Sequence, residues 1–60
     1  MKLSEKLVYE HLLYNQPLGF MVLRRDLEID KRTLSRALRR LMVRGWVVQN
    51  EYFQYVLPEP

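Results

Sequence analysis

The sequence predicts a mainly α domain in which three helices precede a small β-hairpin. Apolar residues recur with helical spacing as far as Arg44, and after Gly45 the pattern changes to the two-residue alternation and β-branched composition of strands. A chain of 60 residues holds one small hydrophobic core. We expect residues 1–57 to form this single domain and residues 58–60 to be a tail, because the two prolines there oppose strand extension.

The first helix is predicted over residues 3–14. Apolar residues at positions 3, 7, 8, 12 and 13 follow the spacing of one helical stripe. Ser4 is expected to cap the helix, which places Glu5 near the positive end of the helix dipole. Pro17 ends the helix, because proline disfavours helical geometry in the residue before it.

Two further helices are predicted over residues 20–27 and 31–44. Asp30 is the expected N-cap of the longer helix, because its carboxylate can accept the free N–H groups of the first turn. Gly45 is expected to take the left-handed conformation that ends many helices. The longer helix is amphipathic, and its apolar face consists of Leu34, Ala37, Leu38 and Leu41.

The segment after Gly45 is predicted to form a β-hairpin. Residues 46–48 begin a β-rich run, and residues 52–57 continue it with aromatic and β-branched side chains. Asn50 and Glu51 are expected to supply the turn between the two strands.

Positive charge is concentrated in the middle of this small basic protein, whose net charge is +3. Between Arg24 and Arg44 there are eight basic and three acidic residues, a net charge of +5. Outside this segment there are two basic and four acidic residues, a net charge of −2. Such segregation indicates an anionic partner. The alternative is a solvated helix face that happens to be rich in arginine.

Residue types that the chain lacks exclude several classes of function. Cysteine is absent, which excludes disulfides, thiolate zinc sites and cysteine nucleophiles. The sequence has no glycine-rich phosphate loop and no metal-ligand spacing. We expect His11, the one histidine, to be a partly exposed structural residue, away from any obvious acid or nucleophile constellation. No apolar run approaches the length of a membrane-spanning helix. We therefore expect an intracellular protein that is not an enzyme and needs no cofactor, metal, membrane or small-molecule effector.

The order of these elements resembles a winged helix-turn-helix domain. The run D-K-R-T-L-S-R-A-L-R-R-L, ending in R-G-W-V, is similar to MarR-type transcription regulators, and the resemblance covers about residues 5–57. It implies a cytoplasmic, DNA-associated protein that binds double-stranded DNA sequence-specifically and regulates transcription. The helix 31–44 would then lie in the major groove.

Three features depart from that family's pattern. Glu28 occupies the turn position between the second and third helices that is often glycine, so a less favourable backbone geometry is expected there. The predicted hairpin loop, residues 49–52, contains no arginine or lysine, so we do not expect it to enter a minor groove. The 60 residues leave no room for the extra terminal helices through which MarR-type proteins dimerise.

The resemblance places the DNA contacts on helix 31–44. We predict Arg32 and Arg36, one turn apart, to be the main base readers, because one arginine can bond two guanine acceptors at once. Arg39 and Arg40 lie further along the helix and are predicted to bind phosphate.

Polar side chains on the same helix complete the predicted site. The hydroxyl groups of Thr33 and Ser35 can read several base edges or bind phosphate. A local hydrogen bond to the backbone is the alternative for Thr33, and Arg44 is predicted to have a structural role. The predicted DNA-binding residues are Lys31, Arg32, Thr33, Ser35, Arg36, Arg39 and Arg40.

A homodimer is also expected, because one small core is marginal and a single recognition helix contacts only a few base pairs. The predicted interface is the first helix together with the hairpin, where the available aromatic side chains are Tyr9, Tyr14, Tyr52 and Tyr55. The main alternative function is a winged helix that binds another protein, since a fold alone does not determine function. Binding of Z-form or single-stranded nucleic acid is a third.

Overall fold

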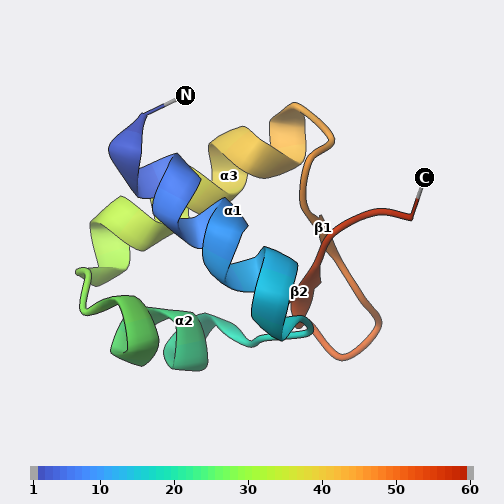
Figure 1. The fold of residues 1–60 in the computed structure, drawn as a ribbon, viewed down its shortest axis with the longest axis horizontal. Coiled ribbons are helices and arrows are strands. Elements are labelled where there is room, and N and C mark those ends of the chain that lie inside the picture. Colours follow the sequence, from blue (N-terminus) through green and yellow to red (C-terminus); the bar gives the residue numbers. More distant parts are fainter. Residues whose placement is uncertain (1, 60) are drawn as a thin grey trace.

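Three helices cross one another and a short hairpin lies beside them (Figure 1). The structure is a computed structural model that describes residues 2–59. Its elements are α1 (Leu3–Asn15), α2 (Phe20–Leu27), α3 (Lys31–Val43), β1 (Val48–Gln49) and β2 (Tyr55–Val56). The predicted mainly α fold with a C-terminal antiparallel hairpin is confirmed, and its topology is consistent with a winged helix. Met1 and Pro60, the outer ends of the predicted domain and tail, lie outside the described residues.

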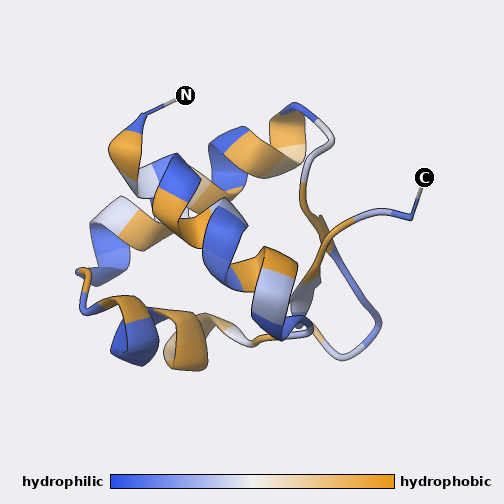
Figure 2. Ribbon diagram, in the orientation of Figure 1, coloured by the Kyte–Doolittle hydropathy of each residue, from blue (hydrophilic) through white to orange (hydrophobic). Residues whose placement is uncertain are grey.

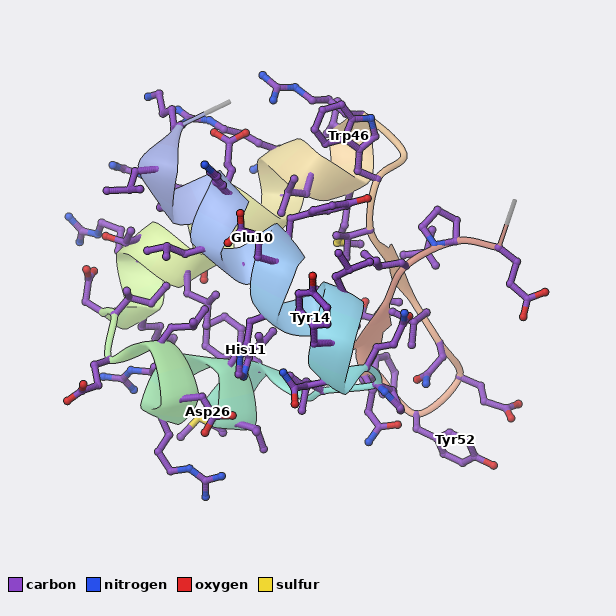
Figure 3. All side chains as sticks on the ribbon, viewed as in Figure 1. Glu10, His11, Tyr14, Asp26, Trp46 and Tyr52 are labelled. Atoms are coloured by element: carbon purple, nitrogen blue, oxygen red, sulfur yellow. The ribbon has the colours of Figure 1, made fainter. Side chains whose placement is uncertain are left out.

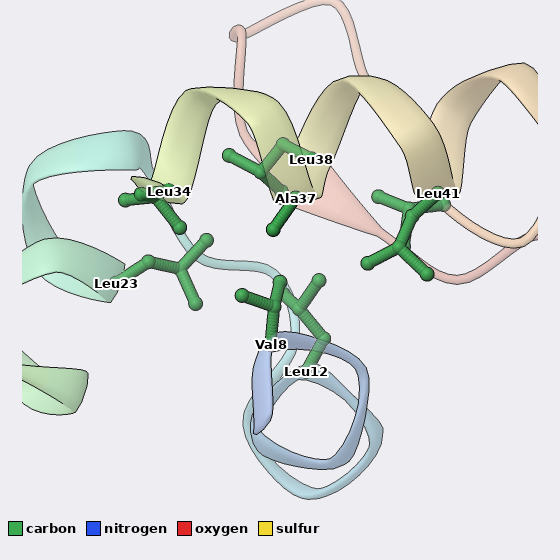
Figure 4. Close-up of a cluster of buried hydrophobic side chains, with 8 residues drawn as sticks. Val8, Leu12, Leu23, Leu34, Ala37, Leu38 and Leu41 are labelled. Carbon is green, nitrogen blue, oxygen red and sulfur yellow. The ribbon is translucent and has the colours of Figure 1, made fainter. Parts of the chain in front are cut away.

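The hydrophobic core lies between α1 and α3. The inner face of α3 points at Val8 and Leu12 of α1, and Leu23 of α2 lies beside them (Figure 4). Figure 2 shows the resulting alternation of hydrophobic and hydrophilic segments along the helices. Every residue of the predicted apolar face of α3 is buried: Leu34, Ala37, Leu38 and Leu41.

The apolar stripe predicted for α1 is wrong in part. Val8 and Leu12 are buried, but Leu3, Leu7 and Leu13 are exposed. Each residue turns an α-helix by about 100°. The side that faces α3 therefore carries positions 5, 8 and 12, whereas positions 3 and 7 lie on the opposite side.

Ser4 does not cap α1, contrary to the prediction. The helix begins at Leu3, and Lys2 occupies the cap position without a side-chain hydrogen bond. Ser4 therefore lies inside the first turn. In that turn the buried Glu5 contacts Arg44 at the end of α3, so the start of α1 is attached to the rest of the fold by a tertiary contact.

Gly45 ends α3 as predicted. Its φ of +80° lies in the left-handed region, which glycine adopts without steric cost. The N–H of Gly45 donates to the carbonyl of Met42 at 3.0 Å, and the N–H of Trp46 donates to that of Leu41 at 2.9 Å. This pair of hydrogen bonds is a Schellman motif. It reverses the chain and returns Val47 to the core.

The hairpin is shorter than predicted and its loop is longer. The strands pair over two residues each, whereas the prediction placed them over residues 46–48 and 52–57. Asn50 explains the difference, because its side-chain oxygen accepts the N–H groups of Tyr52 and Gln54 and folds residues 50–54 into a compact loop. The register pairs Val48 with Val56 and Gln49 with Tyr55.

The hairpin is also attached to the connection between α1 and α2, a contact that the sequence did not reveal. Leu18 and Tyr55 exchange two backbone hydrogen bonds, of 3.1 and 2.7 Å. The side-chain oxygen of Gln16 accepts the N–H of Leu57 at 2.7 Å. The strand β2 is therefore held on both of its edges, by β1 and by Leu18.

The leucine face of α3 carries a first prediction. Leu41→Ala should lower the free energy of unfolding by about 2–5 kcal/mol, because it leaves a cavity at a fully buried position. Val43→Ala is the matched control: Val43 is 81% exposed, and its truncation should change the stability by about 0.5 kcal/mol or less. Urea unfolding followed by circular dichroism measures both. Equal losses in the two variants would contradict the described packing.

Candidate nucleic-acid interface

The helix α3 turns its basic side to solvent. Its leucines and Ala37 are buried against α1 (Figure 4), and the basic residues lie on the other side of the helix. Thr33 is half-buried. The other predicted DNA-binding residues are exposed, namely Lys31, Arg32, Ser35, Arg36, Arg39 and Arg40.

Two shallow recesses lie along this exposed side. The recess near the start of α3 is lined by Arg24, Asp30, Lys31, Arg32 and Ser35. The recess near its end is lined by Arg36, Arg39, Arg40, Val43 and Arg44. Arg24 belongs to α2 and was missing from the predicted set, although the charge count had placed it in the same basic segment.

Four cations of α3 have no acidic partner within the described part of the chain. No ion pair involves Lys31, Arg32, Arg36 or Arg39. Their charged groups are therefore available for hydrogen bonds with an anionic ligand, which are stronger than hydrogen bonds between neutral groups.

Asp30 caps α3 as predicted. Its Oδ2 accepts the N–H of Thr33 at 3.1 Å, and its Oδ1 accepts the Thr33 hydroxyl at 2.6 Å. The Thr33 hydroxyl thus makes a local hydrogen bond, although to a carboxylate and not to the backbone. The hydrogen bonds from the hydroxyl and then from the N–H of Thr33 lower the pKa of Asp30. The start of α3 is held by a charged cap.

The turn between α2 and α3 contains the strained residue that the sequence indicated. Glu28 has φ of 51° and ψ of 44°, the left-handed conformation. For a residue with a Cβ atom this conformation costs about 1–2 kcal/mol. Ile29, the next residue, packs against the core. Its burial helps to hold the strained turn.

A buried carboxylate organises the far end of α3. Arg44 donates from Nη1 to Oε1 of Glu5 at 2.9 Å, and Nη1 of Arg40 lies 3.6 Å from Oε2. The Glu5 side chain is 1% exposed, whereas the two arginine side chains are about half exposed (45% and 48%). The predicted structural role of Arg44 is confirmed, and Arg40 shares it. This cluster was not predicted from the sequence, although the spacing of Glu5, Val8 and Leu12 places them on one side of the helix and was its signal.

The hairpin flanks α3 through Tyr55. This residue lines a groove together with Ser35 and Arg39 of α3, so it lies beside the basic side. At the tip of the hairpin, Tyr52 and Phe53 are exposed, and residues 50–54 include no basic residue.

His11 is partly exposed, as predicted, and it has an acidic partner that the sequence did not reveal. Its Nε2 lies 3.0 Å from Oδ2 of Asp26, and both side chains are partly exposed (Figure 3). The hydrogen bond from His11 is the main cause that lowers the pKa of Asp26. Sequence spacing did not reveal the contact because it joins α1 to α2. The pair connects two helices on the side of the molecule where α1 meets α2.

Residues 2–59 hold neither a helix able to cross a bilayer nor a group of three side chains suited to a metal ion. No family model, curated protein or solved structure matches the sequence. The function is therefore inferred from α3 and its surroundings.

The Asp30 cap should make stability depend on pH in acid. Because folding lowers the pKa of Asp30, its contribution is full above the ordinary value of 3.8 and is lost as the pH falls through the lower folded-state value. Asp30→Asn keeps a capping oxygen but does not titrate. We expect the urea midpoint to fall less in this variant than in the wild type between about pH 6 and about pH 2.5. If the urea midpoint fell equally in the wild type and in Asp30→Asn, the charge of Asp30 would not contribute to the cap.

The Glu5 cluster gives a third prediction. Glu5→Gln should lower the free energy of unfolding by about 1–3 kcal/mol, because glutamine keeps the shape but removes the charge that faces Arg40 and Arg44. Glu10→Gln is the control, since Glu10 forms only an exposed pair with Lys6 at 4.0 Å and should contribute about 0.5 kcal/mol or less. Urea unfolding compares the two, and a smaller loss for Glu5→Gln than for Glu10→Gln would refute the assignment.

Proposed function

We propose that this protein binds double-stranded DNA through α3, as a minimal winged-helix regulator of transcription. The observation that supports this most is the exposed side of α3, where two arginine-lined recesses lie beside four cations that have no acidic partner among residues 2–59. The helix has 13 residues and is therefore about 20 Å long. A helix of this size fits the major groove of B-DNA, which is about 12 Å wide.

Arg32 and Arg36 are the proposed base readers. They lie one turn apart on the exposed side, and neither is held by an acidic group of the described residues. Each can donate two parallel hydrogen bonds to a guanine. The Thr33 hydroxyl donates to the Asp30 cap, so Thr33 helps to hold the first turn of the helix that carries both arginines.

Phosphate contacts flank the base readers in this proposal. Lys31 and Arg24 line the recess at the start of α3, and Arg39 lines the recess at its end. Arg40 is half exposed while one of its nitrogens faces Glu5, so its remaining N–H groups are free for a phosphate oxygen. Such contacts set orientation and supply most of the sequence-independent affinity.

Three further features expected from the sequence stay predictions. They comprise the likeness to MarR-type regulators, the cytoplasmic location and the absence of enzymatic activity. Binding to another protein remains the alternative function, and it is separated from DNA binding by the experiment that follows.

DNA binding should depend on the salt concentration, and the substitutions Arg39→Ala and Arg36→Ala should change it in different ways. With roughly four to six phosphate contacts, log K should fall against log salt with a slope of about −4 to −5 per protomer. Arg39→Ala should weaken binding to all sequences about equally and reduce the slope by about 1. Arg36→Ala should cost about 1–3 kcal/mol at one base position and relax the preference there. Binding-site selection followed by anisotropy titrations at several salt concentrations measures these effects.

The control for lost charge is Arg25→Ala. Arg25 is exposed on α2 and contacts Asp26, and it lines neither recess of α3. The affinity of the Arg25→Ala variant for DNA should stay close to that of the wild type. An affinity that ignores salt, or identical base preferences for the wild type and Arg36→Ala, would count against the proposed function and in favour of a protein-binding module.

A further inference from the structure

The helix α1 has a second apolar side that nothing in the described chain covers. Val8 and Leu12 face the core, but Leu3, Leu7 and Tyr14 are 72%, 40% and 82% exposed. With Glu10 these three residues recur every three or four positions, so they form one line along the helix, here named the outer stripe. Figure 3 shows Glu10 and Tyr14 on the same outward side of α1. A helix that is apolar on two opposite sides is normally covered on both.

We propose that the outer stripe pairs with the outer stripe of a second copy of this chain, with the two α1 helices antiparallel. The charged residues of α1 favour a second copy as the partner and an antiparallel direction. Lys6 and Glu10 lie one turn apart on α1, with Nζ and Oε1 separated by 4.0 Å. When a two-fold axis crosses α1 near position 8, Lys6 of each copy lies opposite Glu10 of the other. A parallel pair would instead bring Lys6 against Lys6 and Glu10 against Glu10, which is unfavourable because like charges repel.

The apolar residues are self-complementary in the same register. Leu7 of the two copies meet close to the axis, and Leu3 lies at the level of Leu13 of the second copy, which borders the outer stripe and is 45% exposed. This is the isologous arrangement of a two-fold dimer, in which the same surface serves both partners. One pair of short helices buries less than about 1,200 Å². The dimer should therefore dissociate in the micromolar range.

The pairing has a consequence for DNA, which rests on the proposed function. The buried sides of α1 and α3 face each other across the core (Figure 4), so their exposed sides point in opposite directions. A dimer joined through α1 carries its two α3 helices on opposite outer sides. It would hold two separate duplexes, one on each side, and not two half-sites of one duplex.

Sedimentation equilibrium of the full chain without DNA tests the interface. From about 10 to about 500 μM the wild type should pass from monomer towards dimer. Glu10→Lys and Lys6→Glu should each weaken dimerisation at least about tenfold, because each places like charges face to face. The double variant with both changes should restore it. Glu51→Lys makes the same charge change on the hairpin loop and should dimerise like the wild type.

The outcomes that overturn the interface are distinct. A wild type that stays monomeric at the highest concentration, or a Glu10→Lys variant that dimerises equally well, would refute it. A double variant that fails to recover while circular dichroism shows it folded would refute the antiparallel register. A wild type that dimerises but binds no DNA would support the interface and overturn the proposed function.

Co-capture of two duplexes tests the orientation. One duplex is immobilised on beads, and a second, labelled duplex of the same sequence is added with the protein. The wild type should retain the labelled duplex, whereas Glu10→Lys should bind the immobilised duplex without retaining the second. A dimeric wild type that binds the immobilised duplex but never retains the labelled one would refute the opposed arrangement of the α3 helices.

Discussion

The packing of α3 on α1 is the contact on which the rest of the structure depends. Leu34, Leu38 and Leu41 are fully or almost fully buried, and a helix that buries one side must expose the other. The basic residues of α3 are therefore on the surface because the leucines are inside. Stability and the proposed function thus depend mainly on opposite sides of one helix.

The two ends of α3 are held by different means. At its start, a charged cap and a strained residue, Glu28, set the direction in which the helix leaves the turn. Near its end, Glu5 faces Arg40 and Arg44 from inside the protein. A buried carboxylate is tolerated because it is paired, and its two arginines remain half exposed and so keep part of their hydration. This arrangement ties part of the basic surface to the core.

The helix α1 serves three surfaces at once. Its inner side completes the core, Glu5 reaches the arginines of α3, and His11 contacts Asp26 of α2. The remaining side is the outer stripe. A protein of 60 residues has few helices to distribute among these tasks, which accounts for the lack of a single apolar side on α1.

The sequence by itself determined the element order, the apolar face of α3, the Asp30 cap and the Gly45 stop, because these depend on residues within one or two helical turns of each other. The predictions failed for Ser4, for the exposed leucines of α1 and for the length of the hairpin. The hairpin is shorter because the side chain of Asn50 folds residues 50–54 into a loop, a local contact that the strand pattern does not encode. Only the tertiary structure decided that Glu5 meets Arg44, that His11 meets Asp26 and that Leu18 pairs with Tyr55. Each of these contacts joins residues distant in the chain, and periodicity along a chain does not encode which side of one helix faces which neighbour.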